Sequence, residues 1–238
     1  MSKLDDYAKK YAGIHTGKDP YKFRDSEETA YTTEKNRGLF DGSQLARKFT
    51  KYIDYTIKYK GRAITILDYG CGQAKQVSFP RTEYDNKTIF GYFDNMIQCY
   101  YCYDPGVPKF SMKPPLGMQF DLTCCADVME HIPEEFIPVV LTEIKNYTKK
   151  NGAMLFSISA NPAKKTFIDG ENLHITTKSI EWWLNIFKEY LGDERAFLMF
   201  HTDDSRKGEG NDGNVWKRIH NSSHFKFKLE KGLYTGFV

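Results

Sequence analysis

The chain has 238 residues, 40% of them hydrophobic, and a formal net charge of +3 at pH 7. This size and apolar share suit one compact domain, and so small a charge argues against a nucleic-acid partner. No apolar run approaches the ~20 residues that a bilayer-spanning helix needs, so no membrane association is expected. Five cysteines, an odd number, and the lack of a secretory leader predict a cytoplasmic protein.

Residues 1–40 are polar, and their apolar residues follow no strong period. Two interpretations stay open for this segment: a short helix with a flap over the functional site, or a loose N-terminal arm. We therefore divide the chain into an N-terminal arm or flap, 1–40, and one main domain, 41–238.

A helix is predicted at the start of the main domain, with Ser43 as its N-cap and Gly61 as its end. Its apolar residues recur at intervals of four and share one face: Leu45, Phe49, Ile53 and Ile57. Two later helices are predicted from similar spacing, over 134–149 and 179–190. The pair Asn151-Gly152 is expected to end the first of these.

Five short segments, apolar on both faces, alternate with helical or loop stretches: 63–69, 98–103, 120–126, 153–159 and 196–201. Such alternation is typical of a parallel sheet covered by helices on both faces. A sixth segment, 225–229, alternates apolar residues with lysine, which suits an edge or antiparallel strand. We therefore predict an α/β fold with a Rossmann-like, mostly parallel sheet and an antiparallel edge strand near the C-terminus.

Cys99 and Cys102 have the CxxC spacing of many metal and redox sites. They fall in a predicted strand, where residues three apart point to opposite faces and cannot share a metal ion. Cys124 and Cys125 diverge for the same reason. We interpret these thiols as structural and expect no metal site.

A turn with two glycines, Gly70 and Gly72, directly follows the first predicted strand. Glycine lets the backbone of such a turn approach a ligand closely, and ligands of α/β sheets bind at the carboxyl ends of the strands. A dinucleotide-binding turn would carry a third glycine, but Lys75 stands at that position, which disfavours NAD. The preceding Asp68 suits a ligand with an ammonium group.

The next two strands also end in polar residues. Asp104 follows the second strand, where a carboxylate can hold a ribose diol, although Asp-Pro-Gly is also an ordinary turn sequence. Its distance along the chain from Gly72 indicates an insertion at about 78–95. The third strand leads into the polar segment 127–131. Three consecutive strand ends with ligand-binding chemistry predict one shared site.

These segments resemble the class I S-adenosylmethionine (SAM)-dependent methyltransferases, in particular the broad group that contains small-molecule and quinone-type enzymes. The family's D-x-G-x-G motif matches Asp68, Gly70 and Gly72, its ribose acid matches Asp104, and its D-V-x-E-H segment matches Asp127, Val128, Glu130 and His131. The resemblance implies SAM as the cofactor. It implies these cofactor-binding residues: Asp68, Tyr69, Gly70, Cys71, Gly72, Gln73, Asp104, Asp127 and Val128.

The chain departs from the family in one respect. Many relatives have an acid after the third strand that contacts the adenine amino group, but no Asp or Glu lies between Pro105 and Gln119. Backbone groups, or the stretch 118–120, are the alternatives.

Two histidines are candidates for the catalytic step. The loop after the fourth strand, which such enzymes place over the acceptor, contains His174, a candidate general base or acceptor ligand. The alternative is a hydrogen-bonded loop histidine. His131 belongs to the D-V-x-E-H pattern, and its alternative role is to orient the loop. Trp182 and Trp183 are candidates for an aromatic wall or for core residues.

The resemblance does not identify the methyl acceptor. We expect a small molecule, such as a sugar or another hydroxylated metabolite. The alternatives are a nucleic-acid acceptor, a non-catalytic SAM-binding protein, and an NAD-dependent oxidoreductase, which Lys75 disfavours. The sequence gives no information on the oligomeric state.

Overall fold

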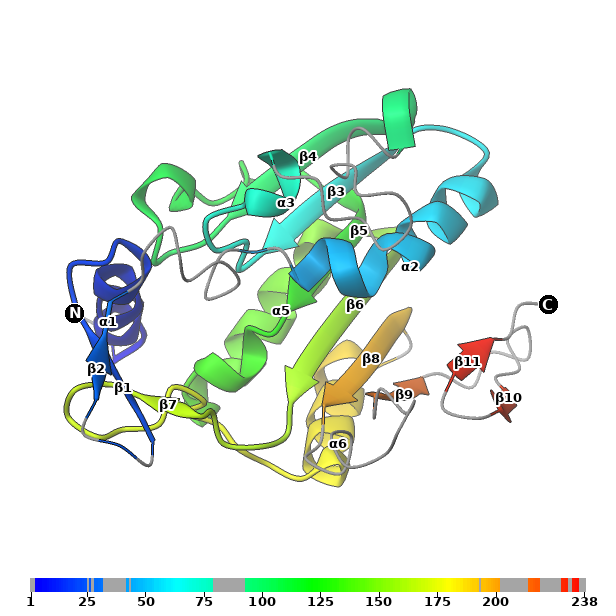
Figure 1. The fold of residues 1–238 in the computed structure, drawn as a ribbon. Helices are drawn as coiled ribbons and strands as arrows, with labels where there is room; N and C mark the ends of the chain where they lie inside the picture. The colour runs from blue at the N-terminus through cyan, green and yellow to red at the C-terminus, as the bar shows by residue number, and fades with distance from the viewer. Residues whose placement is uncertain are drawn as a thin grey trace.

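A computed structural model describes residues 3–24, 26, 28–31, 42, 44–78, 93–192, 194–201, 214–218, 228–230 and 233–235. Its centre is a six-stranded sheet in the order β4-β3-β5-β6-β8-β9 (Figure 1). The strands are β3 (Ile64–Tyr69), β4 (Ile97–Tyr103), β5 (Phe120–Ala126), β6 (Thr148–Ser159), β8 (Ala196–His201) and β9 (Asn214–Arg218). The first five in this order are parallel, and β9 pairs antiparallel with β8. The predicted Rossmann-like α/β fold is confirmed.

Helices cover both faces of the sheet. One face is covered by α2 (Gln44–Lys60) and the other by α5 (Ile137–Tyr147) and α6 (Ile180–Leu191) (Figure 1). The apolar face of α2 forms one core with β3 and β5, and those of α5 and α6 form a second, larger core. Ser179 begins α6, because its side chain accepts a hydrogen bond from the Trp182 amide at 3.2 Å. Ser43, the expected N-cap of α2, lies outside the described residues.

The predicted end of the helix over 134–149 is wrong. A 3₁₀ turn, η4 (Glu134–Phe136), precedes α5, and α5 stops at Tyr147. Thr148 already belongs to β6 and pairs with Phe120, so the strand begins five residues before the predicted 153. Its hydroxyl donates to the Ile144 carbonyl at 2.8 Å, which satisfies one of the last helical carbonyls and ends the helix without a glycine.

The antiparallel edge strand is β9, whereas the sequence pattern placed it at 225–229. Residues 228 and 229 belong to β10 (Lys228–Glu230), which pairs antiparallel with β11 (Leu233–Thr235) in a separate two-stranded sheet. Residues 225–227 lie outside the described part of the chain. The five residues of β9 include only two apolar side chains, Val215 and Trp216, so no alternating pattern marked this strand.

The N-terminal segment forms α1 (Lys3–His15), β1 (Tyr21–Phe23) and β2 (Thr29–Ala30). The two strands extend a small sheet, β2-β1-β7, with β7 (Lys165–Thr166) from the loop after β6. Lys10 of α1 also forms ion pairs with Asp169 and Glu171 of that loop. These contacts hold α1 beside the loop that follows β6 (Figure 1).

Three short elements complete the described chain: α3 (Lys75–Ser78) and the 3₁₀ turns η1 (Asp94–Met96) and η2 (Pro108–Phe110). The insertion predicted at 78–95 falls almost wholly on residues outside the described part. Within the described residues, no helix is both long enough and apolar enough to cross a bilayer.

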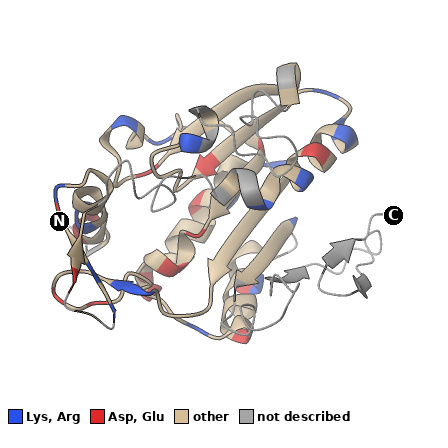
Figure 2. Ribbon diagram, viewed as in Figure 1, with Lys and Arg blue, Asp and Glu red and all other residues tan. Residues whose placement is uncertain are grey.

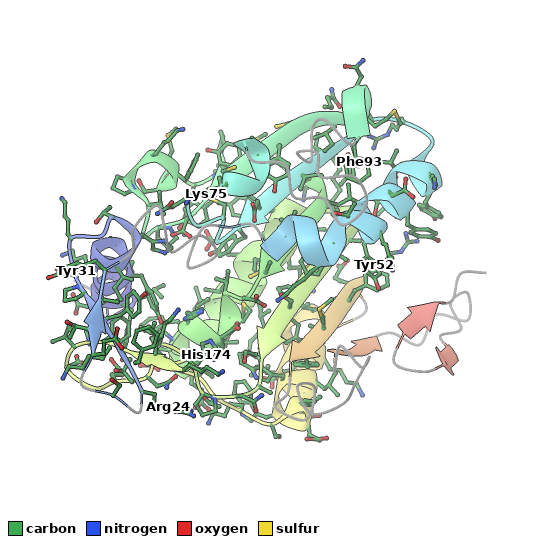
Figure 3. All side chains as sticks on the ribbon, viewed as in Figure 1. Arg24, Tyr31, Tyr52, Lys75, Phe93 and His174 are labelled. Carbon is green, nitrogen blue, oxygen red and sulfur yellow. The ribbon has the colours of Figure 1, made fainter. Side chains whose placement is uncertain are left out.

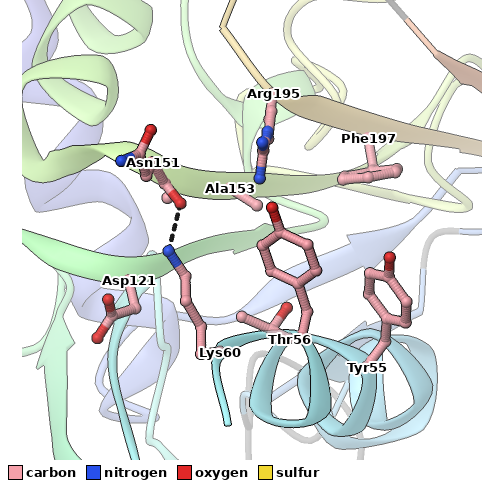
Figure 4. A pocket seen from close by; sticks show the side chains of 10 residues that line it. Tyr55, Thr56, Lys60, Asp121, Asn151, Ala153, Arg195 and Phe197 are labelled. Atoms are coloured by element: carbon pink, nitrogen blue, oxygen red, sulfur yellow. Dashed lines mark hydrogen bonds between the residues drawn. The ribbon is translucent and has the colours of Figure 1, made fainter. Parts of the chain in front are cut away.

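At the amino-terminal edge of the sheet, a small cavity of about 30 Å³ lies between α2 and the start of β6 (Figure 4). Lys60 closes one side by donating to the Asn151 carbonyl at 2.5 Å. Asp121 lies at this edge with a fully buried side chain. It accepts hydrogen bonds from Arg62 at 2.7 Å, from the Thr65 amide at 3.0 Å and from Lys149 at 3.1 Å. The Asp121 carboxylate therefore connects three segments of the chain: its own strand β5, residues 62–65 and the start of β6.

We expect Asp121→Asn to lower the free energy of unfolding by about 2–3 kcal/mol at pH 7, because charged hydrogen bonds to a buried carboxylate become neutral or are lost. Burial opposes ionisation of Asp121, but the Arg62, Thr65 and Lys149 hydrogen bonds outweigh it and lower its pKa from the ordinary 3.8. Its contribution is therefore complete above pH 3.8 and lost as the pH falls through the folded-state pKa. Urea unfolding between pH 3 and 7 should show the two proteins converging in acid; a constant difference would contradict this.

Candidate functional site

A cavity of about 490 Å³ opens at the carboxyl ends of the central strands. The arrowheads of β3 and β6 point toward the side of the molecule where α1 and β7 lie (Figure 1). The ends of β3, β4, β5 and β6 supply one wall, and α1 with the loop around β7 supplies the other. This volume lies in the range of small-molecule sites, about 300–1,000 Å³.

The turn after β3 brings backbone to the cavity wall. Gly70 and Gly72 both have left-handed φ values, +78° and +55°, and both line the cavity. The amides of Gly70 and Cys71 donate to the Tyr103 carbonyl at 2.7 and 3.1 Å, which fixes the turn to the end of β4. A Cβ atom on Gly70 would lie 2.3 Å from Cγ2 of Val128. The Val128 side chain can therefore pack against the turn only when residue 70 is glycine.

Asp104, at the end of β4, lies beside this turn. Its Oδ2 accepts a hydrogen bond from the Gly72 amide at 2.9 Å, and its Oδ1 accepts one from the Gly106 amide at 2.8 Å. The side chain is buried against the protein but contributes to the cavity wall. Each carboxylate oxygen has a second lone-pair direction, so Asp104 can still accept hydrogen bonds from a ligand.

Asp127, at the end of β5, has a φ of +55°. It forms an ion pair with Lys48 of α2, whose Nζ lies 2.6 Å from Oδ1, and Ser157 of β6 donates to the same oxygen at 2.6 Å. The unusual backbone conformation is thus held by contacts from two other elements. Asp127 and the following Val128 both line the cavity.

Two histidines of the cavity wall meet a buried glutamate, Glu130. Glu130 and His131 lie in the 3₁₀ turn η3 (Met129–His131), and His174 lies in the loop after β7. The two imidazole rings meet edge to face with their centroids 4.9 Å apart. Figure 3 labels His174 at the junction of this loop with the strand ends. Both histidines line the cavity.

Burial shifts the titration of all three groups. Burial, with the nearby Asp127 carboxylate, raises the pKa of Glu130 to about 8. Burial lowers the pKa of His131 to about 3, and the proximity of His174 adds to this. Burial also lowers the pKa of His174, although its hydrogen bond with the Asn161 carbonyl opposes the shift. Both imidazoles are therefore neutral at pH 7.

The structure brings together eight of the sequence-predicted site residues along the cavity: Tyr69, Gly70, Gly72, Asp104, Asp127, Val128, His131 and His174. Asp68, Cys71 and Gln73 do not line it. Asp68 is buried and accepts a hydrogen bond from the Tyr100 hydroxyl at 2.9 Å. Gln73 instead donates to the His15 carbonyl at 2.8 Å, which joins the glycine turn to α1.

Neither Trp182 nor Trp183 lines the cavity. Trp183 is fully buried, and Trp182 packs edge to face against it at 5.0 Å between ring centroids. The core interpretation of this pair therefore holds, because the apolar face of α6 turns toward the sheet and not toward the cavity.

Several cavity residues come from segments without a recognisable motif. Tyr7 and Tyr11 of α1 are examples: the Tyr11 hydroxyl donates to the Leu173 carbonyl and lies 3.0 Å from Nδ1 of His131. Glu143 of α5 is another, held by Tyr69 at 2.8 Å. The one sequence signal for α1 was the pair of tyrosines four residues apart, which is too short a pattern to predict a role.

Comparison with known proteins gives one match. A family model described as a methyltransferase domain matches residues 42–190, more than half of the chain. No curated protein and no solved structure matches the chain. The matched residues run from the start of α2 to the last turns of α6 and include every strand end that lines the cavity.

Proposed function

The chain belongs to the family of methyltransferase domains, and from this membership we propose that it transfers a methyl group from SAM to a small-molecule acceptor bound in the 490 Å³ cavity. One observation carries the proposal: Gly70, Gly72 and Asp104 lie on one wall of a single cavity, at the ends of adjacent parallel strands. This is the edge of the sheet where α/β folds bind their ligands.

The residues on this wall suit the chemical groups of SAM. Asp104 offers carboxylate lone pairs for the ribose hydroxyls, and the Gly70–Gly72 turn offers backbone without side chains beside the amino-acid end. Asp68 lies behind that turn, so its carboxylate acts on the ammonium through the turn or through water. Val128 supplies apolar surface at the end of β5.

The adenine ring needs flat apolar surface and a polar partner. The stretch 118–120 does not line the cavity, so it does not supply the partner. Pro105, Ile132 and Val140 give apolar surface to the cavity, and the Glu143 carboxylate lies among them, paired with Lys113. We assign the adenine amino group to Glu143, on α5, in place of the family's acid after the third strand.

Bound SAM supplies an electrophilic methyl group, which passes to the acceptor in an in-line displacement. The protein's part is to align the acceptor and to remove its proton where the nucleophile has one. His174 is neutral and lines the cavity, and its Nδ1 lies 2.6 Å from the Asn161 carbonyl. A carbonyl oxygen only accepts, so Nδ1 has the proton and Nε2 is the basic nitrogen.

The charge distribution favours a small acceptor over a nucleic acid. Lysine and arginine are interspersed with aspartate and glutamate along the described helices and loops in the view of Figure 2, and the formal net charge of the chain is only +3. Phosphate-backbone binding needs a continuous basic face. The cavity, in contrast, is bounded on one side by α1. Its size suits an acceptor small enough to be enclosed completely.

Two measurements test the proposal. SAM should raise the thermal unfolding midpoint of the protein, with about 2.7 kcal/mol of added stability at 100 times its Kd, whereas NAD should not. Labelled SAM, incubated with the enzyme and a cell extract fractionated by size, should label low-mass material. Label in RNA or DNA would favour the nucleic-acid alternative, and SAM binding without any label would favour a non-catalytic protein.

We expect His174→Ala to lower the turnover number by about 10²–10⁴-fold, the usual contribution of a general base, while the Kd for SAM changes little. Turnover and SAM affinity are measured separately, by product formation and by calorimetry. Thr177→Ala is the matched control, because Thr177 is exposed on the same loop and should leave both values unchanged. Full turnover in the His174 variant would remove it from the catalytic step.

A further inference from the structure

Glu130, His131 and His174 converge beside the cavity, which the two histidines line and behind which Glu130 is buried. One potential ligand atom from each residue lies within 4.8 Å of the other two. A tetrahedral ion with bonds of about 2.0–2.2 Å needs ligand atoms roughly 3.4 Å apart. The separations of up to 4.8 Å therefore exceed the spacing of a bound site by at most about 1.4 Å.

Both imidazoles are oriented by backbone carbonyls. Nδ1 of His131 lies 2.7 Å from the Leu173 carbonyl, and Nδ1 of His174 lies 2.6 Å from the Asn161 carbonyl. Because a carbonyl only accepts, each Nδ1 has the proton, and the lone pair of each ring is on Nε2. Metal-binding histidines are held in this way, with the second ring nitrogen donating to a carbonyl or carboxylate.

Glu130 gives independent evidence for a missing partner. Its side chain is fully buried. Oε1 accepts a hydrogen bond from the Ser159 amide at 2.9 Å, but Oε2 is buried without a hydrogen-bond partner in the described structure. A buried carboxyl oxygen without a partner is costly whether the group is ionised or protonated, and it calls for an explanation. A cation shared with the two histidines would supply the partner.

We propose that Glu130, His131 and His174 form a binding site for a divalent transition-metal ion, with its open coordination position toward the cavity. Two imidazoles and one carboxylate favour Zn²⁺ or a similar ion over Mg²⁺ or Ca²⁺, which prefer all-oxygen ligands. Three protein ligands with an open position are typical of catalytic zinc sites. From the sequence alone we expect no metal site, because only the cysteines have the spacing of a metal-binding motif.

The site also suggests what kind of acceptor the enzyme takes, an extension that rests on the proposed function. An ion held by these two cavity-lining histidines would lie beside the space that we assign to the acceptor. It would bind an acceptor hydroxyl and lower its pKa, and the proton would pass to solvent water. The acceptor would then be a hydroxylated molecule that binds the ion through the oxygen that receives the methyl group. With the ion bound, His174 would be a ligand through Nε2 and would no longer act as the general base, so the ion would replace it in activating the hydroxyl.

The ion site is tested without any methyl transfer. We expect the chelator-treated full chain to bind one Zn²⁺ in calorimetry, and Co²⁺ to give the visible absorption of a site with nitrogen ligands. Glu130→Gln, which keeps the side-chain shape, and His174→Ala should each raise the Kd for Zn²⁺ by more than about 100-fold, beyond the 10–100-fold typical of second-shell changes.

Glu134→Gln is the matched control: it alters an exposed glutamate that does not line the cavity and should bind both Zn²⁺ and SAM like the wild type. Thermal unfolding shows whether each variant is folded, and SAM calorimetry on the same samples tests the proposed function separately. No saturable Zn²⁺ binding to the wild type, or wild-type affinity in both folded variants, would overturn the ion site while leaving SAM binding intact. Binding of Mg²⁺ but not Zn²⁺ would overturn the assigned class of ion.

Discussion

Replacing Asp104 with alanine should raise the Kd for SAM by about 10²–10⁴-fold. A carboxylate that accepts hydrogen bonds from both ribose hydroxyls contributes about 1.5–3 kcal/mol for each, and every 1.4 kcal/mol is a factor of ten in Kd. Asp104 is the acidic side chain that lies directly against the glycine turn, through its 2.9 Å hydrogen bond with the Gly72 amide. Calorimetry with SAM measures the effect.

Asp104→Ala also removes the hydrogen bonds to Gly72 and Gly106, so the turn itself can shift. Asp104→Asn separates these effects, because an amide oxygen can still accept from one of the two amides. Thermal unfolding without SAM shows how much of the loss comes from stability. Asp54→Ala on α2, far from the cavity and partly exposed, should bind SAM normally. Wild-type affinity in a folded Asp104→Ala protein would refute the assigned role.

The second large effect concerns Gly70. Gly70→Ala should lower the free energy of unfolding by about 2–6 kcal/mol. Part of this, about 1–3 kcal/mol, is the cost of a non-glycine residue at a φ of +78°. A further 1–3 kcal/mol, roughly, comes from overpacking, because the new Cβ would lie 2.3 Å from Val128 Cγ2. SAM affinity should fall as well, since the turn lines the cavity.

Two variants separate the backbone cost from the steric cost. Gly117 has a similar φ of +83° but nothing within 4 Å of an added Cβ, so Gly117→Ala should show the backbone cost alone. Adding Val128→Ala to Gly70→Ala should restore the part of the unfolding free energy that is lost to the steric clash. A double-mutant cycle measures this coupling between the two positions. Urea unfolding gives all the values. Equal destabilisation by Gly70→Ala and Gly117→Ala would mean that the contact with Val128 has no energetic weight.

Much of the site followed from the sequence because its cofactor wall is built from strand ends. Gly70, Asp104 and Asp127 each follow an apolar strand, and the ends of parallel strands meet at one edge by geometry. The opposite wall could not be predicted in this way. It depends on how α1 and the loop after β7 fold back, through contacts such as the ion pair between Lys10 and Glu171.

The cluster of Glu130, His131 and His174 could likewise be predicted only in part from the sequence. The sequence places Glu130 beside His131 in one short segment, but His174 lies 43 residues farther along, and no spacing rule connects them. Asp127 and Lys48 are likewise far apart in the chain, yet they form an ion pair beside the cavity. Such pairs depend on the packing of whole elements, which local patterns do not record.

By itself, the sequence determined the parallel strands, the helices that cover both sheet faces, and the family to which the domain belongs. These depend on hydrophobic periodicity and on glycine turns, which are local properties of the chain. The tertiary structure alone decided the edge strand β9, the early start of β6 and the second wall of the cavity. Each of these is fixed by contacts between residues far apart in sequence, and the free energy of such contacts appears only when the segments pack together.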